Sequence, residues 1–345
     1  MFGINRCKIE LLNRLSSDVD KIKIDYNPKN RILNFLDFLT YAPFSTLKNR
    51  RKDAIAHILS HSEAHLLYFL KFKKSVVTCY DITPFLYDYG NPLSRRKVRW
   101  SFKAMTKADH IISISQFTKD EIVKYFDYPA ENITVATIGV DLDTYKPLTD
   151  LEETRKKFNL FQDNKYIIYV GNEEPRMNVD VIVKALKELK EKHPTLKFLK
   201  VGEPNMAGAR DKLLDQIKTL GLEDDIIFTG YVSEFDMPRL YNLADVSVYI
   251  CSYTGFGLPP LEGMACGTPT ITSNAATLPE IAGEGAITIP PTDHIALTEA
   301  IDKLLTNKEF AKELSEKGKL QASKFTWDNW VKTTEEVYKT LLNTK

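Results

Sequence analysis

The chain has 345 residues, of which 43% are hydrophobic and 27% charged, and its net charge is +1 at pH 7. At about 100–200 residues per domain, this length and composition indicate a globular protein of two domains. Four scattered cysteines without a C-x-x-C pair argue against a disulfide framework or a zinc site and favour a reducing compartment; they are Cys7, Cys79, Cys251 and Cys266.

The N-terminal segment and the distribution of charge indicate where in the cell the protein acts. The N-terminus, MFGINRCKIELLNRL, lacks the apolar core of a signal peptide, and the longest apolar run, residues 66–70, is far shorter than the ~20 residues that span a bilayer. We therefore expect a cytoplasmic protein without a nucleic-acid partner. Residues 1–150 carry 23 Lys and Arg against 17 Asp and Glu, or +6, and the remainder carries 24 against 29, or −5. The front half is the better candidate to meet an anionic surface or acceptor.

Apolar runs in the front half alternate with helical patterns. We expect strands in SVVTCYDI, HIISIS and ITVATIGV, and helices at residues 95–106 and 118–125. The second helix would open with a capping box formed by Thr118 and Glu121.

Two other front-half patterns have two readings each. The basic and aromatic clusters KNRRK, KFKK and RRKVRW could dock an anionic membrane face or a lipid-diphosphate acceptor, or be solvated helix surface. His57, His61 and His65 recur every four residues, which favours a half-exposed helix face over a metal stripe, because matching carboxylates are missing.

The periodicity is lost in VDLDTYKPLTDLEE, so we place the domain boundary at residues 146/147. From there the pattern alternates strongly, with expected strands at residues 166–171, 197–202, 225–230, 246–250, 269–273 and 286–289. Between them we expect helices at residues 179–191, 212–220, 237–243 and 295–305. Apolar strands separated by helices indicate a parallel, doubly wound sheet. The last helix, residues 327–342, is amphipathic and is expected to pack back on the first domain.

The stretch TGFGLPPLEGMACGTP, residues 254–269, follows one of these strands. Gly255 and Gly257 would expose backbone N–H groups in a turn that points into a helix of about residues 261–266, an arrangement that holds phosphate. Glu262, in the first turn, could accept hydrogen bonds from a ribose. The plainer reading is a tight turn with a glutamate that compensates the helix dipole.

The run SYTGFGLPPLEGMACGTPTITSNAATLPEIAGEGA resembles the donor-site signature of the retaining family 4 glycosyltransferases. The similarity extends to YIIYVGNEEPRMNVDVIVKAL, FTGYVSEFDMPRLYNLADVSVY, YDITPFLY, ADHIISISQFTKDEIVKYF and ITVATIGVDLDTY, and so covers nearly the whole chain. The resemblance implies the GT-B fold, in which two Rossmann-like domains, here residues 1–146 for the acceptor and 147–325 for the donor, face each other across a cleft.

The resemblance also implies an activity and a set of site residues. A hexose would move from a nucleoside-diphosphate sugar to an acceptor hydroxyl with retention of configuration and without a metal or other cofactor. Arg176 would neutralise the departing diphosphate, Tyr231 and Val232 would flank the base, and Glu262 would hold the ribose. The remaining donor-binding positions would be Gly171, Asn172, Thr254, Gly255, Phe256, Gly257 and Leu258.

The chain departs from the family pattern at several positions. Thr254 stands where the family usually has a glutamate that contacts the hexose, and Met177 where it has a second diphosphate cation. Tyr80, before Asp81, stands where a histidine usually lies near the reacting sugar; we take both as candidate catalytic residues, although Asp81 also suits an ordinary turn. The strand that the family places before FGINRCKIELLNRL is not found there, so we expect either a truncated sequence or another segment in that place, and only Gly3 remains of the loop that follows the strand.

Two functions follow. The first is a hexosyltransferase that builds surface polysaccharide or glycolipid, with GDP-mannose as the expected donor, a UDP-hexose second, and a glycan or lipid-linked sugar as acceptor. The other is a catalytically silent relative that binds nucleotide or glycan and supports a partner enzyme. Two D-x-D patterns, at residues 18–20 and 141–143, stand in poor contexts for a metal, and the glycosylation pattern at Asn132 lacks a secretory signal.

Overall fold

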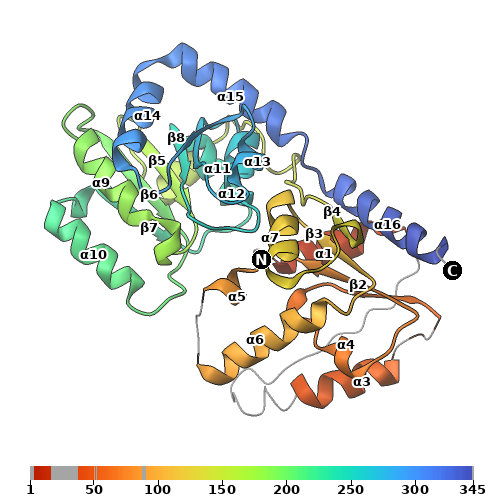
Figure 1. The fold of residues 1–345 in the computed structure, drawn as a ribbon. Helices are drawn as coiled ribbons and strands as arrows, with labels where there is room; N and C mark the ends of the chain where they lie inside the picture. Colours follow the sequence, from red (N-terminus) through yellow and green to blue (C-terminus); the bar gives the residue numbers. More distant parts are fainter. Residues whose placement is uncertain (1–3, 17–37, 50, 52, 88–90, 344–345) are drawn as a thin grey trace. The chain divides into compact units, whose positions relative to one another are not determined.

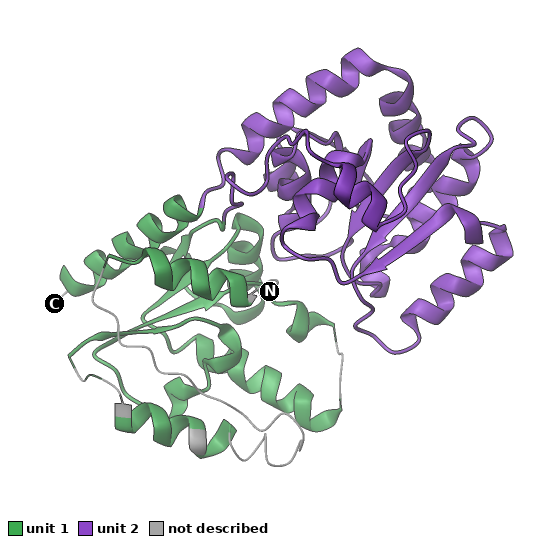
Figure 2. Cartoon of the chain, turned by 180° about the vertical axis from the view of Figure 1, so that it is seen from behind, with its two compact units in different colours: residues 1–138, 327–345 green, residues 139–326 purple. Residues whose placement is uncertain are grey.

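The computed structural model describes residues 4–16, 38–49, 51, 53–87 and 91–343. The chain divides into two compact units, residues 1–138 with 327–345, and residues 139–326 (Figure 2). The boundary derived from the sequence lay eight residues further along the chain, at 146/147.

Unit 1 is built on a four-stranded parallel sheet in the order β1-β2-β3-β4 (Figure 1). Its strands are β1 (Ile55–Ile58), β2 (Lys74–Cys79), β3 (His110–Ser113) and β4 (Ile133–Val135). The helices of the unit are α1 (Ile4–Arg14), α3 (Tyr41–Asn49), α4 (Leu66–Phe69), α5 (Thr83–Leu86), α6 (Pro92–Met105), α7 (Gln116–Phe126) and α16 (Trp327–Asn343). The last helix packs against the first, where Arg14 Nε lies 3.1 Å from Asp328 Oδ1.

Two expectations about unit 1 are wrong. His57 lies on strand β1, while His61 and His65 lie in and after a 3₁₀ turn, so the three do not share a helix face, and the last two are buried. The capping box is also displaced: α7 starts at Gln116, and Ser115 Oγ caps it by accepting from Thr118 N at 3.0 Å.

Unit 2 contains a six-stranded, fully parallel sheet in the order β10-β9-β8-β5-β6-β7. Its strands are β5 (Lys165–Val170), β6 (Leu196–Val201), β7 (Ile226–Gly230), β8 (Val246–Tyr249), β9 (Thr270–Ser273) and β10 (Ala286–Ile289). The helices are α8 (Glu152–Lys157), α9 (Val179–Leu189), α10 (Ala209–Leu220), α11 (Asp236–Leu243), α12 (Leu258–Ala265), α13 (Leu278–Ala282), α14 (His294–Thr306) and α15 (Lys308–Ala322).

Helices cover both faces of this sheet, because its central strands are apolar on both sides (Figure 1). Helix α9 contacts α10, α14 and strand β6, and α12 contacts α11, α15 and strands β8 and β9. The buried side of α9 repeats at helical spacing through Val179, Ile182, Val183 and Leu186. Helix α15 was not foreseen from the sequence. None of the helices in the described part of the chain combines the length and apolarity needed to cross a membrane.

Candidate functional site

Strand order places a ligand crevice in unit 2. Numbered along the unit, the sheet runs 3-2-1-4-5-6, and the direction of winding reverses between β5 and β8. In open parallel sheets, ligands bind outside the carboxyl ends of the strands at this switch point. The two segments that leave β5 and β8 there are residues 171–178 and 250–257.

These two segments are hydrogen-bonded to each other. Ser252 N donates to Arg176 O at 2.7 Å, and Arg176 Nη1 donates to Tyr253 O at 2.8 Å. Asn178 Nδ2 donates to Ile250 O and to Ser252 Oγ, both at 2.9 Å. Arg176 therefore lies against the segment that leads into Gly255.

The Arg176 guanidinium is oriented before any ligand binds. Its side chain is 16% exposed, and its Nε donates to Glu174 Oε2 at 2.7 Å. Although burial opposes it, the Glu174 carboxylate raises the pKa of Arg176, so the side chain keeps its charge. Among the described residues no partner accepts from Nη2, which leaves donors available to an anion.

The turn after β8 leads directly into α12. Gly257 is the N-cap at φ 137°, and a Cβ there would lie 2.9 Å from Leu278 Cδ2, so the position favours glycine. No side chain caps this helix. Because Pro259 and Pro260 carry no N–H, the unpaired donors of the first turn are concentrated at Gly257 and Leu258.

Helix α12 begins three residues earlier than expected, so Glu262 lies in its second turn and not its first. The prolines start the helix instead of preceding it, which suits their fixed φ. The Glu262 side chain is buried, and Tyr241 Oη on α11 donates to its Oε2 at 3.2 Å. Thr254 is half-buried; burial raises the pKa of Tyr249, and a hydrogen bond with Thr254 opposes the rise.

Glycines line the remaining carboxyl ends. Gly171 N donates to Val201 O, and Gly202 N to Gly230 O, so the ladder continues into the turns. A Cβ on Gly171 would lie 2.6 Å from Tyr169 Oη, because the turn folds back over that ring. The Tyr169 hydroxyl in turn donates to Asn172 O at 2.7 Å. Along the carboxyl edge the strands follow in the order β7, β6, β5, β8. The residues predicted to contact the base follow β7, and those predicted to contact the phosphates follow β5 and β8.

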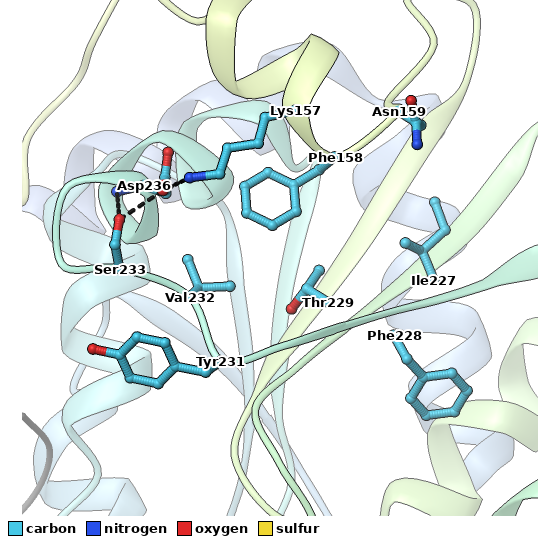
Figure 3. A pocket seen from close by; sticks show the side chains of 10 residues that line it. All are labelled: Lys157, Phe158, Asn159, Ile227, Phe228, Thr229, Tyr231, Val232, Ser233 and Asp236. Carbon is cyan, nitrogen blue, oxygen red and sulfur yellow. Dashed lines mark hydrogen bonds and ion pairs between the residues drawn. The ribbon is translucent and has the colours of Figure 1, made fainter.

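A pocket of about 430 Å³ lies at the β7 side of the unit (Figure 3). Its lining includes Tyr231, which is 63% exposed, and the buried Val232, together with Phe158 and Thr229. Lys157 and Ser233 both point at Asp236, with Nζ and Oγ at 2.7 and 2.6 Å from its Oδ2 (Figure 3). Although burial opposes it, these two bonds hold the pKa of Asp236 below its ordinary value. The switch-point segments do not line this pocket.

The two predicted catalytic residues of unit 1, Tyr80 and Asp81, make local contacts within that unit. Asp81 Oδ1 accepts from Thr83 N, the first residue of α5, at 2.8 Å, while Ile82 is the N-cap residue of that helix. Tyr80 is 3% exposed, and burial, with the Cys7 thiol of α1 nearby, raises its pKa. Their catalytic roles stay predictions. Of the D-x-D patterns, Asp141 accepts from Asp143 N and from Thr144, as in a polar turn, and residues 18–20 lie outside the described residues.

The sequence reading missed a buried ionic cluster beneath the glycine edge. Lys200 on β6 pairs with Glu173 at 2.7 Å, and Arg210 on α10 pairs with the same carboxylate at 2.6 Å. The signal was present in KFLKVG, where a lysine interrupts an otherwise apolar strand.

Comparison with known proteins identifies the family of the chain. The family model described as Glycosyl transferases group 1 matches residues 150–321, and the model described as Glycosyltransferase Family 4 matches residues 14–144. The chain belongs to the family 4 glycosyltransferases. Among curated proteins, this glycosyltransferase is 29% identical to O-antigen chain mannosyltransferase B of Escherichia coli, over 98% of its own length and 96% of that protein.

Solved structures confirm the predicted GT-B fold class. Sucrose-phosphate synthase from Thermosynechococcus elongatus has a TM-score of 0.76 at 21% identity, covering 96% of this chain and 83% of that one. Anabaena HepE in complex with UDP and glucose has a TM-score of 0.77 at 16% identity, covering 99% and 96%. The cleft expected between the domains stays a prediction.

Proposed function

We propose that this glycosyltransferase transfers a hexose from a nucleoside-diphosphate sugar to an acceptor hydroxyl with retention of configuration. The observation that carries the proposal is the contact of Arg176 with the Tyr253 carbonyl at the switch point of the sheet. This contact holds a charged guanidinium against the segment that leads into the N-terminus of α12 at Gly257 and Leu258, and a diphosphate would use both the charge and the N–H donors.

The chemistry of this site is stabilisation of a leaving group. The bond between the sugar C1 and the diphosphate oxygen breaks, the acceptor oxygen bonds to C1, and the proton of the acceptor hydroxyl passes to the departing diphosphate. Negative charge grows on the departing diphosphate, so fixed donors around it favour the transition state over the ground state. The proposed mechanism needs no metal, because Arg176 and the α12 N-terminus supply the positive potential.

For the donor, we propose GDP-mannose first and a UDP-hexose second. The first choice is supported by the similarity to an O-antigen chain mannosyltransferase, and the second by the likeness to HepE, which was solved with UDP and glucose. Tyr231 and Val232 would contact the base, Gly171 and Asn172 the phosphates, and Glu262 the ribose, along one strand edge. The acceptor would be a growing glycan or a lipid-linked sugar in surface polysaccharide synthesis.

The test is release of nucleoside diphosphate from a panel of nucleotide-sugars, with and without sugar acceptors. We expect release from one donor class, accelerated by an α-mannoside acceptor, with the anomeric configuration retained in the product. Nucleotide binding without release from any donor would favour the catalytically silent relative. No nucleotide binding at all would overturn both readings of the site.

We further propose that unit 1 contacts an anionic membrane through the α3–α4–α6 surface, defined as Phe44, Leu47, Phe69, Arg99, Lys103 and Lys107. The three apolar side chains are exposed, and so are the three cations. Helix α3 contacts α4, which contacts α6, and Lys107 Nζ lies 5.2 Å from the Tyr68 ring. Exposed apolar side chains beside exposed cations match an interface with acidic headgroups.

Vesicle sedimentation tests this surface. We expect binding to vesicles of phosphatidylcholine and phosphatidylglycerol in a ~7:3 ratio, and weak binding to vesicles of phosphatidylcholine alone. The acidic lipid should strengthen binding because each cation near an anionic surface contributes about 1 kcal/mol. The double variant Phe44→Ser, Leu47→Ser should lose binding. The matched control is Leu320→Ser on α15, because Leu320 and Phe44 are both 67% exposed. Equal binding to both vesicle types, or equal loss in the control, would contradict the proposal.

A further inference from the structure

Lys200 is the most deeply buried cation in the described residues. It lies on β6, is 0% exposed, and faces Tyr169 on β5 and Phe228 on β7 across the sheet. Lysine is almost never fully buried unless it is paired, because removing its charge from water costs several kcal/mol. Some property of this part of the molecule must compensate for that cost.

All three donors of the ammonium are used within the protein. Lys200 Nζ donates to Gly171 O and to Gly202 O, each at 2.8 Å, and lies 2.7 Å from Glu173 Oε1. Because an ammonium has three N–H groups, none remains for a ligand. Lys200 therefore acts on the turns after β5 and β6, and not on anything bound above them.

The opposite charge is fixed as well. Arg210 donates to both oxygens of Glu173, with Nε at 2.8 Å from each, and its guanidinium stacks 4.3 Å over the Phe228 ring. Although burial opposes it, hydrogen bonds from Arg210 and Lys200 hold the pKa of Glu173 below its ordinary value. The segment after β5 is thus held at Gly171 by its carbonyl and at Glu173 by its carboxylate, three residues before Arg176.

The two glycine turns are also in steric contact. A Cβ on Gly202 would lie 2.9 Å from Gly171 O, the same carbonyl that Lys200 binds. That carbonyl and the Gly202 carbonyl therefore point down toward the ammonium, inside the protein. Carbonyl oxygens at this edge would repel an anion, so turning them inward removes that repulsion from the segment that carries Arg176.

We infer that Lys200 is a positioning residue for the diphosphate: its buried ammonium draws the Gly171 and Gly202 carbonyls inward and so shapes the segment that presents Arg176. The inference rests on the proposed function of the switch point. It concerns a side chain that touches no substrate, so its effect must appear in how the diphosphate is bound.

The test compares Lys200→Met with Lys190→Met. Lys190 is a matched control because it holds the other end of the same strand, with Nζ 3.3 Å from Leu196 O and 2.8 Å from Asp225 Oδ1. Binding of GDP and GMP, or of UDP and UMP, is measured by calorimetry for each variant, together with its melting temperature. The ratio of diphosphate to monophosphate affinity isolates the contacts of the terminal phosphate.

We expect both variants to melt at lower temperature, and only Lys200→Met to lower the diphosphate-to-monophosphate ratio, by about tenfold, as for one or two displaced donors. An unchanged ratio in Lys200→Met would leave it a purely structural residue and overturn the inference. If that variant does not fold, Glu173→Gln, which keeps an oxygen for Lys200 but removes its charge, should lower the ratio in the same direction; an unchanged ratio overturns the inference. Failure of the unaltered protein to bind any of these nucleotides would instead overturn the proposed function.

Discussion

The carboxyl edges of the two sheets differ in how the chain leaves each strand. In unit 1 side chains close the helices that follow: Ser60 Oγ accepts from Ser62 N, Asp81 Oδ1 from Thr83 N and Ser115 Oγ from Thr118 N. In unit 2, Gly171 and Gly202 directly follow β5 and β6, and β7 ends at Gly230. The helices α9, α10, α12 and α13, which follow β5, β6, β8 and β9, begin without a side-chain cap, whereas Asp293 caps α14 after β10.

This difference in helix capping indicates that the same place in two similar folds contributes to stability in one unit and to ligand binding in the other. A cap satisfies the free N–H groups of a helix and stabilises it by about 1 kcal/mol, but it also removes donors that a ligand could use. Unit 1 spends its helix N-termini on its own folding. Unit 2 leaves them open at the switch point, which is consistent with an anionic donor on that unit.

If the open edge of unit 2 serves catalysis, the largest loss of activity is expected on changing Arg176. Changing Arg176→Gln should lower kcat by about 10²–10³-fold, because it removes the guanidinium that we propose stabilises the departing diphosphate. Arg176→Lys should recover part of the rate, since a point charge remains without the bidentate geometry. Steady-state rates with saturating donor measure both. An unchanged rate in Arg176→Gln would exclude the arginine from the mechanism.

Glu262 should show the next largest effect. In Glu262→Gln we expect the preference for a ribonucleoside diphosphate over its 2′-deoxy or 3′-deoxy analogue to fall by roughly 10–100-fold, the range for a hydrogen bond to a charged group. Competition binding of the nucleotides measures the preference. Tyr241→Phe, which removes the 3.2 Å bond to the carboxylate, should cause a smaller loss of the same kind. Preserved discrimination in Glu262→Gln would remove the ribose contact.

Gly257→Ala tests whether the open α12 turn depends on glycine. The φ of 137° and the Leu278 contact should cost about 1–3 kcal/mol of unfolding free energy and weaken diphosphate binding. The control is Gly208→Ala, at φ 73° with nothing within 4 Å of the added Cβ, which should cost stability alone. Denaturant unfolding and calorimetry separate the two effects. Equal nucleotide binding in both variants would show that the turn tolerates a side chain.

Ser115→Ala tests whether a capped helix of unit 1 contributes to stability alone. Loss of the α7 cap should lower the unfolding free energy by about 1 kcal/mol, because Thr118 N loses its acceptor. Nucleotide affinity should not change, since the cap serves folding only. A loss of affinity as large as the loss of stability would contradict the separation of roles.

The smallest effect near neutral pH is expected from His65, since unit 1 buries neutral rings where unit 2 buries paired charges. Burial, and then the charge of Lys97, lowers the pKa of His65 from 6.5 to about 3. Between these values the unfolded chain binds a proton that the folded chain does not, so stability is full above pH 6.5 and falls toward pH 3, by at most about 1.4 kcal/mol per pH unit. In His65→Leu the unfolding curve should depend less on pH over that window; an identical pH dependence would exclude His65.

Much of the fold could be predicted from the spacing of apolar residues and from the positions of glycine and proline. The six strands of unit 2, ending in or near glycine, were predictable because buried parallel strands are apolar throughout and short. Strand β1 was not, since AIAHIL is a short apolar run with histidines at helical spacing, and only pairing with β2 makes it a strand. Helix α15 has few apolar residues; it is held by close packing, as where a Cβ on Gly318 would lie 3.1 Å from Gly285 O.

The sequence by itself determined the class of the protein, the alternation of strands and helices, and the glycine-proline turn with Glu262 behind it, because these depend on local backbone freedom and on apolar periodicity. Only the tertiary structure decided that Arg176 lies against Tyr253, 77 residues away, and that Lys200 draws two carbonyls inward. Such contacts depend on strand order, which brings β5 beside β8 and β6, and no local pattern encodes which strands become neighbours.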